Sequence, residues 1–228
     1  MVDYIVHCDR KPSLVIVTDI DSARLSRAAS ILPPSEAERH GVKLMYVNTT
    51  NFEDPIAFMK RFAPDGFDDV FVYAPVKPVI EMGDRLLGRD GCLNFFAGPT
   101  KTDFRAELNF YNVHYASTHI VGTSGGNTDD MREALRMMED GRLNPAAMIT
   151  HICGLDAVAD VTLNLDKIPG GKKLCYTNIS LPLTAISDLE KPGRTDPLMR
   201  ALAEICGRHG GLWSAEAEKF LLENAKPI

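Results

Sequence analysis

Asp19 closes a short apolar run near the start of the chain, Leu14–Thr18, and a helical pattern follows at once. A continuous β-branched run of this length indicates a strand that is buried on both of its faces. Nucleotide-binding sheets place the acid that contacts a ribose at the carboxyl end of such a strand, beside the start of a helix. The pattern therefore predicts that Asp19 binds a ribose. The alternative is that Asp19 caps the helix, although Asp21 is available for that purpose.

Further apolar runs alternate with helical patterns along the first half of the chain. After the strand that ends at Asp19, we expect strands at 42–47, 69–74 and 91–97, with helices between them. This alternation, with short connections, is typical of an α/β fold with a parallel sheet and helices on both of its faces. A doubly wound sheet normally begins with its central strand and a glycine-rich phosphate turn. This chain instead begins with a weak helical pattern over Met1–Cys8, and its first glycine is Gly41.

The second half of the chain has a different pattern. A further strand is expected at 119–122, and then a helix capped by Asn127 or Thr128. We expect that helix to turn Met131, Leu135 and Met138 inward, and we interpret Met131, Met137 and Met138 as core residues. A late strand at 170–176 and two capped helices, from Asp196 and from Ser214, complete the pattern, and Pro192-Gly193 is interpreted as a loop.

Composition excludes several classes of function. The net charge of −6 and the lack of a basic run argue against a nucleic-acid partner. No apolar stretch approaches twenty residues and no signal peptide is visible, so we expect no membrane partner. The five cysteines are scattered singly, which fits reduced thiols in a cytoplasmic protein and excludes a local CxxC zinc site. His119 and His151 lack a second ligand at a metal-like spacing, so we interpret both as structural and predict no metal ligands.

Several motifs together resemble the carboxyl-terminal part of the medium-chain, zinc-type alcohol and polyol dehydrogenases. They are VIVTDIDSARLSRA, DVFVYAPV, GCLNFFAGP, STHIVGTSGGNTDDMREALRMMEDGRLNP and ITHICGLDAVADVTLNLDKIPGGKK. The tail from KLCYTNIS onward is most similar to the sorbose-1-phosphate reductase branch. The resemblance implies a Rossmann-type doubly wound parallel sheet that lacks its first strand. It implies a partial NAD-binding domain over 1–123, and crossover helices with a remnant of the catalytic domain over 124–228.

The resemblance also implies a set of cofactor contacts. Asp19 would bind both adenosine ribose hydroxyls and favour NAD over NADP, while Arg24 would lie near the adenosine phosphate or be a solvated helix charge. After the strand expected at 69–74, Tyr73, Ala74 and Pro75 would wall the adenine and ribose. After the strand expected at 91–97, backbone groups of Phe96, Ala97 and Gly98 would meet the nicotinamide amide. Tyr73 could equally be a core residue.

The functional expectation follows from this partial match. The chain would be the cofactor-binding portion of an NAD(H)-dependent zinc-type dehydrogenase or reductase that acts on a polyol or sugar phosphate. The zinc ligands and catalytic residues would lie in an amino-terminal domain, so no catalytic residue is assigned here and the chain alone is expected to be inactive. A homo-oligomer is expected, through the edge near Leu108–Gly122. The alternative is a non-catalytic, truncated Rossmann-type nucleotide-binding or structural fragment.

Overall fold

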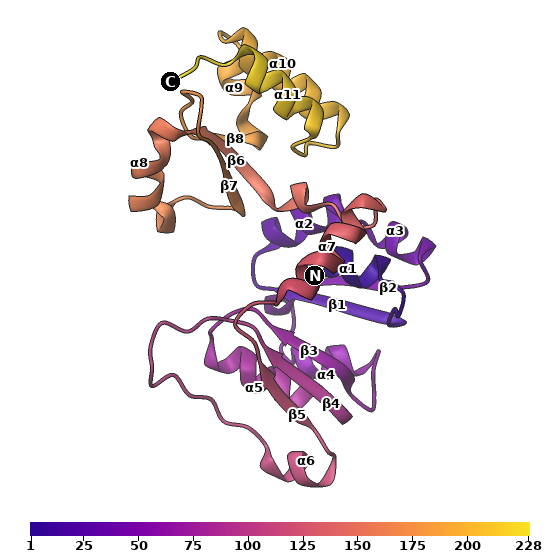
Figure 1. The fold of residues 1–228 in the computed structure, drawn as a ribbon. Coiled ribbons are helices and arrows are strands. Elements are labelled where there is room, and N and C mark those ends of the chain that lie inside the picture. The colour runs from indigo at the N-terminus through magenta and orange to yellow at the C-terminus, as the bar shows by residue number, and fades with distance from the viewer. The chain divides into compact units, whose positions relative to one another are not determined.

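Two parallel sheets occupy the unit Ile5–Met137 of the computed structural model, which describes residues 1–228 (Figure 1). Strand β1 (Leu14–Asp19) pairs with β2 (Lys43–Asn48), and the register runs from Leu14 opposite Lys43 to Asp19 opposite Asn48. The other sheet has the order β3 (Phe67–Val72), β4 (Leu87–Phe95) and β5 (His119–Gly122). The predicted α/β class with parallel sheets is confirmed.

The sheet lacks its central strand, as the resemblance implies, and its remaining strands are divided into two sheets. Doubly wound domains place strands in the order 3-2-1-4-5-6. The observed order β2-β1 corresponds to strands 3-2 of that arrangement, and β3-β4-β5 corresponds to strands 4-5-6. Strands β1 and β3 are not hydrogen-bonded to each other. The residues of β1 are consequently half-buried, with Thr18 exposed, rather than buried on both faces as predicted. The reason is that β1 has a paired strand on one side only.

The helices of this unit begin where the local sequence supplies caps. They are α2 (Ser22–Ile31), α3 (Pro34–Arg39), α4 (Pro55–Lys60), α5 (Lys77–Leu86), α6 (Phe110–Tyr115) and α7 (Thr128–Glu139), with η1 (Thr49–Asn51) between β2 and α4. Asp21 caps α2 and Asp54 caps α4. Helix α3 was not predicted; Pro34 opens it, because proline suits the first position of a helix.

Helix α5 packs on β3 and β4 and makes the core of that sheet. Ile80, Val72 and Leu93 are buried together there. Gly83 permits this close approach, because a Cβ atom at that position would lie 3.0 Å from Cδ1 of Leu93. On α7 the predicted inward stripe is wrong: Met131, Leu135 and Met138 are exposed, and Met137 is the buried residue. An apolar stripe identifies a helix face, but it does not establish that another element covers that face.

The other unit consists of Met1–Tyr4 and Met138–Ile228. Helix α1 (Val2–His7) begins in it. Its sheet has β6 (Ile149–Gly154) between parallel β7 (Lys172–Tyr176) and antiparallel β8 (Thr184–Ala185). The remaining elements are η2 (Pro145–Met148), η3 (Leu155–Ala157), α8 (Val158–Leu163), η4 (Leu165–Lys167), η5 (Ile186–Asp188), α9 (Glu190–Gly193), α10 (Pro197–Arg208) and α11 (Ala215–Asn224).

The two carboxyl-terminal helices pack against the sheet in this unit's core. Leu202 of α10 and Leu221 of α11 are fully buried against Ile152 of β6, as their helical spacing predicts. Pro192-Gly193 is not a loop but the end of α9, where Gly193 lies close to the backbone of Arg200. None of the helices in either unit combines the length and the apolar composition that crossing a membrane requires.

Candidate cofactor site

The predicted cofactor residues lie where strands of the first unit end. Asp19 ends β1, Tyr73 directly follows β3, and Phe96 directly follows β4. The strands within each sheet are parallel, so their carboxyl ends share one edge. In open α/β sheets, ligands bind outside this edge.

The Asp19 carboxylate is held by two kinds of donor. Arg24 donates to it twice, from Nε to Oδ2 at 2.9 Å and from Nη2 to Oδ1 at 2.7 Å. The backbone N–H of Asp21 also donates to Oδ1, at 2.9 Å. Helix α2 is capped by Asp21, whose side chain accepts from the backbone N–H groups of residues 23 and 24. Asp19 is therefore not the helix cap.

This arrangement fixes the charge of Asp19. The hydrogen bond from Arg24 holds the pKa of Asp19 at about 2, against partial desolvation, with help from the Asp21 N–H. The same pair raises the pKa of Arg24. Asp19 is thus ionised at neutral pH and can accept hydrogen bonds from hydroxyl groups, which is the chemistry that a ribose diol requires. Arg24 is paired with Asp19, and its Nη1 also lies 3.5 Å from Oδ2 of Asp21.

The Asp19–Arg24 pair predicts a loss of fold stability at low pH. Because the folded-state pKa of Asp19 is depressed from 3.8 to about 2, the pair stabilises the fold above the unfolded pKa, and this contribution is lost as the pH falls through about 4 to 2. In carboxyl-carbon NMR titrations we expect the Asp19 midpoint to rise toward 3.8 in Arg24→Gln. Arg132→Gln, which removes an exposed ion pair on α7, should leave the midpoint unchanged. Equal midpoints in wild type and Arg24→Gln would contradict this assignment.

Asn48 supports the turn that follows Asp19, and sequence reasoning did not single it out. Its Nδ2 donates to the carbonyl oxygen of Ile20 at 3.2 Å and to Oγ of Ser22 at 2.8 Å. Its register partner on the neighbouring strand is Asp19 itself. The available signal was a polar side chain at the carboxyl end of a second parallel strand. Ile20, held by this contact, is 69% exposed and gives an apolar surface beside the carboxylate.

The aromatic residues predicted at the other sheet lie together. Tyr73 and Phe96 are 52% and 49% exposed, and their ring centroids are 5.5 Å apart at 58°. Tyr73 is therefore not a core residue, although partial burial raises its pKa. Two exposed aromatic faces at one strand edge can pack against a planar ring of a ligand.

The backbone next to Phe96 is already partly engaged. The N–H groups of Phe96 and Ala97 both donate to the carbonyl oxygen of Val72, each at 3.0 Å. A ligand amide at this position would therefore have to use the carbonyl oxygens of this segment. Ala97 is buried, whereas Gly98 is exposed with open space on its Cβ side. Ala74 is half-buried and Pro75 is exposed.

The predicted residues thus form two groups. Asp19 and Arg24 are joined by an ion pair on the first sheet, and Tyr73 and Phe96 are joined by a ring contact on the second. No hydrogen bond or ring contact links the two groups. Of the histidines interpreted as structural, His119 bonds Asp90 at 3.0 Å, and His151 bonds the hydroxyl of Thr150 at 2.9 Å.

Comparison with known proteins identifies the family of the chain. The family model described as zinc-binding dehydrogenase matches residues 14–140. Mannitol-1-phosphate 5-dehydrogenase of Aliivibrio fischeri is 52% identical over 223 residues, which are 97% of this chain and 53% of that protein. L-sorbose 1-phosphate reductase of Klebsiella pneumoniae is 43% identical over 227 residues, which are 100% of this chain and 52% of that protein. The chain therefore spans about half the length of these relatives.

Solved structures agree on the fold. The 2R,3R-butanediol dehydrogenase of Bacillus subtilis superposes with a TM-score of 0.59 at 18% identity, over 74% of this chain and 45% of that chain. The benzyl alcohol dehydrogenase of Acinetobacter calcoaceticus gives a TM-score of 0.56 at 17% identity, over 72% of this chain and 43% of that chain. The expected resemblance is confirmed: the chain belongs to the zinc-binding dehydrogenase family.

Proposed function

We propose that these 228 residues form the cofactor-binding portion of an NAD(H)-dependent dehydrogenase or reductase whose substrate is a polyol or sugar phosphate. The observation that carries the proposal is the ionised Asp19 carboxylate at the end of β1, beside the exposed Ile20. The carboxylate suits the two hydroxyls of an adenosine ribose, and the apolar side chain suits the face of an adenine. The names of the two relatives, which denote mannitol 1-phosphate and L-sorbose 1-phosphate as substrates, support the substrate class.

We assign further contacts with the cofactor to the second sheet. Tyr73, Ala74 and Pro75 would border the adenine and ribose, and Phe96, Ala97 and Gly98 would border the nicotinamide. The open space at Gly98 and the exposed Tyr73–Phe96 pair support this assignment. When bound, the cofactor would supply nicotinamide C4, which accepts a hydride from the carbinol carbon when the alcohol is oxidised and returns one to the carbonyl carbon when the product is reduced. The role of this chain is to orient the ring and to exclude water from one of its faces.

The Lewis acid for this reaction is placed outside these residues. Polarising a substrate carbonyl requires a metal or an equivalent group beside the nicotinamide. Among residues 1–228, the group of His, Cys, Asp and Glu side chains close enough to share one ion is His7, Glu36 and His40. That group precedes the strands rather than following them, so it does not fit a catalytic zinc at the cofactor edge.

Assembly and location are part of the same proposal. Strand β5 pairs only with β4, and its residues are exposed, including the apolar Ile120 and Val121. An apolar edge strand of this kind favours pairing with a second copy, so a homo-oligomer through the Leu108–Gly122 edge is proposed. All five cysteines are free thiols, which supports a reducing, cytoplasmic location.

A second candidate is a non-catalytic nucleotide-binding or structural fragment. The observation that favours it is the break between the two sheets, because β1 and β3 both lack a partner on the side where the doubly wound order places the central strand. Both candidates retain the ribose end of the site. They differ in whether hydride transfer occurs once a complementary polypeptide is present.

The ribose assignment can be tested on the chain itself. We titrate the isotope-labelled chain with adenosine monophosphate and expect amide NMR shifts centred on Asp19, Ile20 and Arg24, with affinity in the millimolar range. The matched probe, 2'-deoxyadenosine monophosphate, should bind about 3- to 10-fold more weakly, because one hydroxyl contact to a carboxylate is lost. Shifts centred elsewhere, or equal affinity for the two nucleotides, would contradict the proposed role of Asp19.

A further inference from the structure

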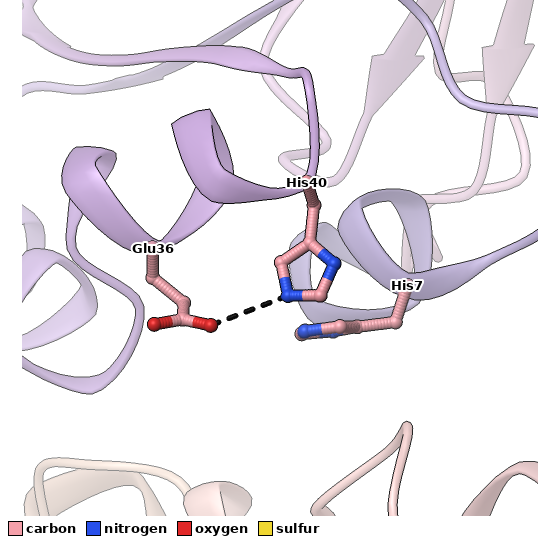
Figure 2. A group of neighbouring side chains, drawn as sticks. All are labelled: His7, Glu36 and His40. Carbon is pink, nitrogen blue, oxygen red and sulfur yellow. Dashed lines mark hydrogen bonds and ion pairs between the residues drawn. The ribbon is translucent and has the colours of Figure 1, made fainter.

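Three potential metal ligands from two helices converge in the first unit (Figure 2). They are His7, in the last turn of α1, and Glu36 and His40, in and directly after α3. Their ligand atoms all lie within 4.8 Å of one another. Nε2 of His40 lies 3.2 Å from Oε1 of Glu36, and the rings of His7 and His40 meet edge to face at a centroid distance of 4.5 Å.

Local structure explains why these side chains meet. Glu36 and His40 are four residues apart along α3, so they share one face of that helix. His40 is its C-cap residue, and its backbone N–H bonds the carbonyl oxygens of Ala37 and Glu38. His7 is held nearby because its neighbour Val6 is fully buried. His7 and Glu36 are themselves half-buried, which limits the freedom that both would lose on binding an ion.

The group lies away from the candidate cofactor site. His40 is followed by the start of β2, and α1 leads into the start of β1, whose first residue is opposite Lys43. Asp19 and Asn48 end these same two strands. An ion bound by His7, Glu36 and His40 would therefore lie at the amino-terminal edge of the sheet, opposite the edge assigned to the cofactor.

The geometry is close to that of a zinc site. Zinc binds histidine nitrogen and carboxylate oxygen at about 2.0–2.2 Å with tetrahedral angles, so two of its ligand atoms lie about 3.3 Å apart. The 3.2 Å separation of His40 and Glu36 already satisfies this requirement. The ligand atom of His7 lies within 4.8 Å of the other two, so the group would have to close around the ion on binding. Three protein ligands would leave the fourth position to water.

We propose that His7, Glu36 and His40 bind one divalent transition-metal ion of the zinc type, which fastens α1 to α3. Two imidazoles and one carboxylate suit zinc and its neighbours rather than magnesium or calcium, which prefer oxygen ligands. Arg39 competes with an ion for Glu36, because it forms an ion pair with the other carboxylate oxygen of that residue. The Arg39 side chain is 71% exposed and can turn into solvent while Oε1 binds the ion.

Two other histidine–carboxylate pairs serve as controls for the contact between His40 and Glu36. His119 pairs with Asp90, and His209 pairs with Glu216, but each of these pairs contains one histidine only. If the contact between His40 and Glu36 were also only an ion pair, all three histidines would respond alike to zinc. The proposal instead requires that only the variants of the three-residue group change zinc binding.

The test is zinc calorimetry on the purified chain after chelator treatment. We expect one zinc per chain, with a dissociation constant that His7→Asn, Glu36→Gln and His40→Asn each weaken by at least about 10-fold. His209→Asn should bind as wild type does. Replacement of zinc by cobalt(II) should give visible absorption typical of a four-coordinate site, which His40→Asn abolishes. Circular dichroism checks that each variant is folded, and Glu36→Gln, which conserves size, serves if a histidine variant unfolds.

Two outcomes would overturn the proposal: zinc binding equal in wild type and His40→Asn, or no zinc bound at about 100 μM. The inference does not depend on the proposed function. Loss of this site would leave the nucleotide-binding experiment unaffected, because the two groups lie at opposite ends of the strands.

Discussion

The 228-residue chain alone is expected to show no NAD-dependent oxidation of a phosphorylated polyol, and to gain that activity when produced with a complementary polypeptide. The chosen complement is the part of the Aliivibrio fischeri relative that this chain does not match, which the family resemblance places before the matched half. A strand inserted between β1 and β3 would join the two sheets in the doubly wound order. The glycine turn after that strand would supply the helix N-terminus on which the cofactor pyrophosphate rests.

The expected change is from no detectable turnover to a rate on the order of 1 s⁻¹ or above with mannitol 1-phosphate. The dissociation constant for NADH should also fall, from weaker than about 1 mM for the chain alone into the micromolar range. Each polypeptide alone is the control. Micromolar NADH binding or turnover by the chain alone would show that this prediction is wrong.

Hydrogen exchange at backbone amides shows whether the complementary polypeptide inserts a strand between β1 and β3 or is only present beside the chain. Pairing of a new strand would slow exchange at the backbone amides of β1 and β3, because those strands now expose one unpaired side. Exchange in β7, which belongs to the other unit, should change little. If turnover appears without added protection in β1 and β3, the central-strand interpretation is contradicted, although the proposed dehydrogenase function stands.

The sequence predicted local features of this site well. Asp19 ends a strand, Asp21 caps the following helix, and Pro55 opens a helix after Asp54, because each depends on neighbouring residues alone. The carboxyl-terminal helices were likewise predicted with their buried leucines. The resemblance to a known family was carried by such short motifs, and the comparison with known proteins confirms it.

Features that depend on distant partners were not predictable. The apolar run of β1 indicated burial on both faces, but burial also needs a second neighbouring strand. The exposed Met131 and Leu135 show the same limit on α7. Asn48 holds the turn at Ile20 from another strand, and His7 meets His40 across two helices. No periodicity or spacing rule joins residues so far apart in the chain.

The paired geometry of Asp19 and Arg24 leads to the second large expected effect, on cofactor preference. The carboxylate would bind the ribose diol of NAD and repel the 2'-phosphate of NADP. Arg24 now donates twice to that carboxylate, so Asp19→Ala would remove these hydrogen bonds and leave the guanidinium paired with Asp21 alone, close to the place proposed for a 2'-phosphate. Arginine suits a phosphate there because its fork of donors matches phosphate oxygens.

We therefore expect Asp19→Ala, measured in the reconstituted enzyme, to lower kcat/KM for NAD by about 10- to 100-fold, as the loss of charged hydrogen bonds worth about 1.5–3 kcal/mol implies. Its kcat/KM for NADP should rise, so that the preference inverts. The double variant Asp19→Ala with Arg24→Gln should lose the gain for NADP while remaining poor with NAD. Asp21→Ala removes the cap of α2 and the weaker of the two ion pairs of Arg24, but it leaves the Asp19 carboxylate with both of its hydrogen bonds from Arg24. It should lower stability by about 1 kcal/mol without changing the preference. A preference unchanged in Asp19→Ala would exclude Asp19 as the residue that selects the cofactor, because no other acid ends a strand in this sheet.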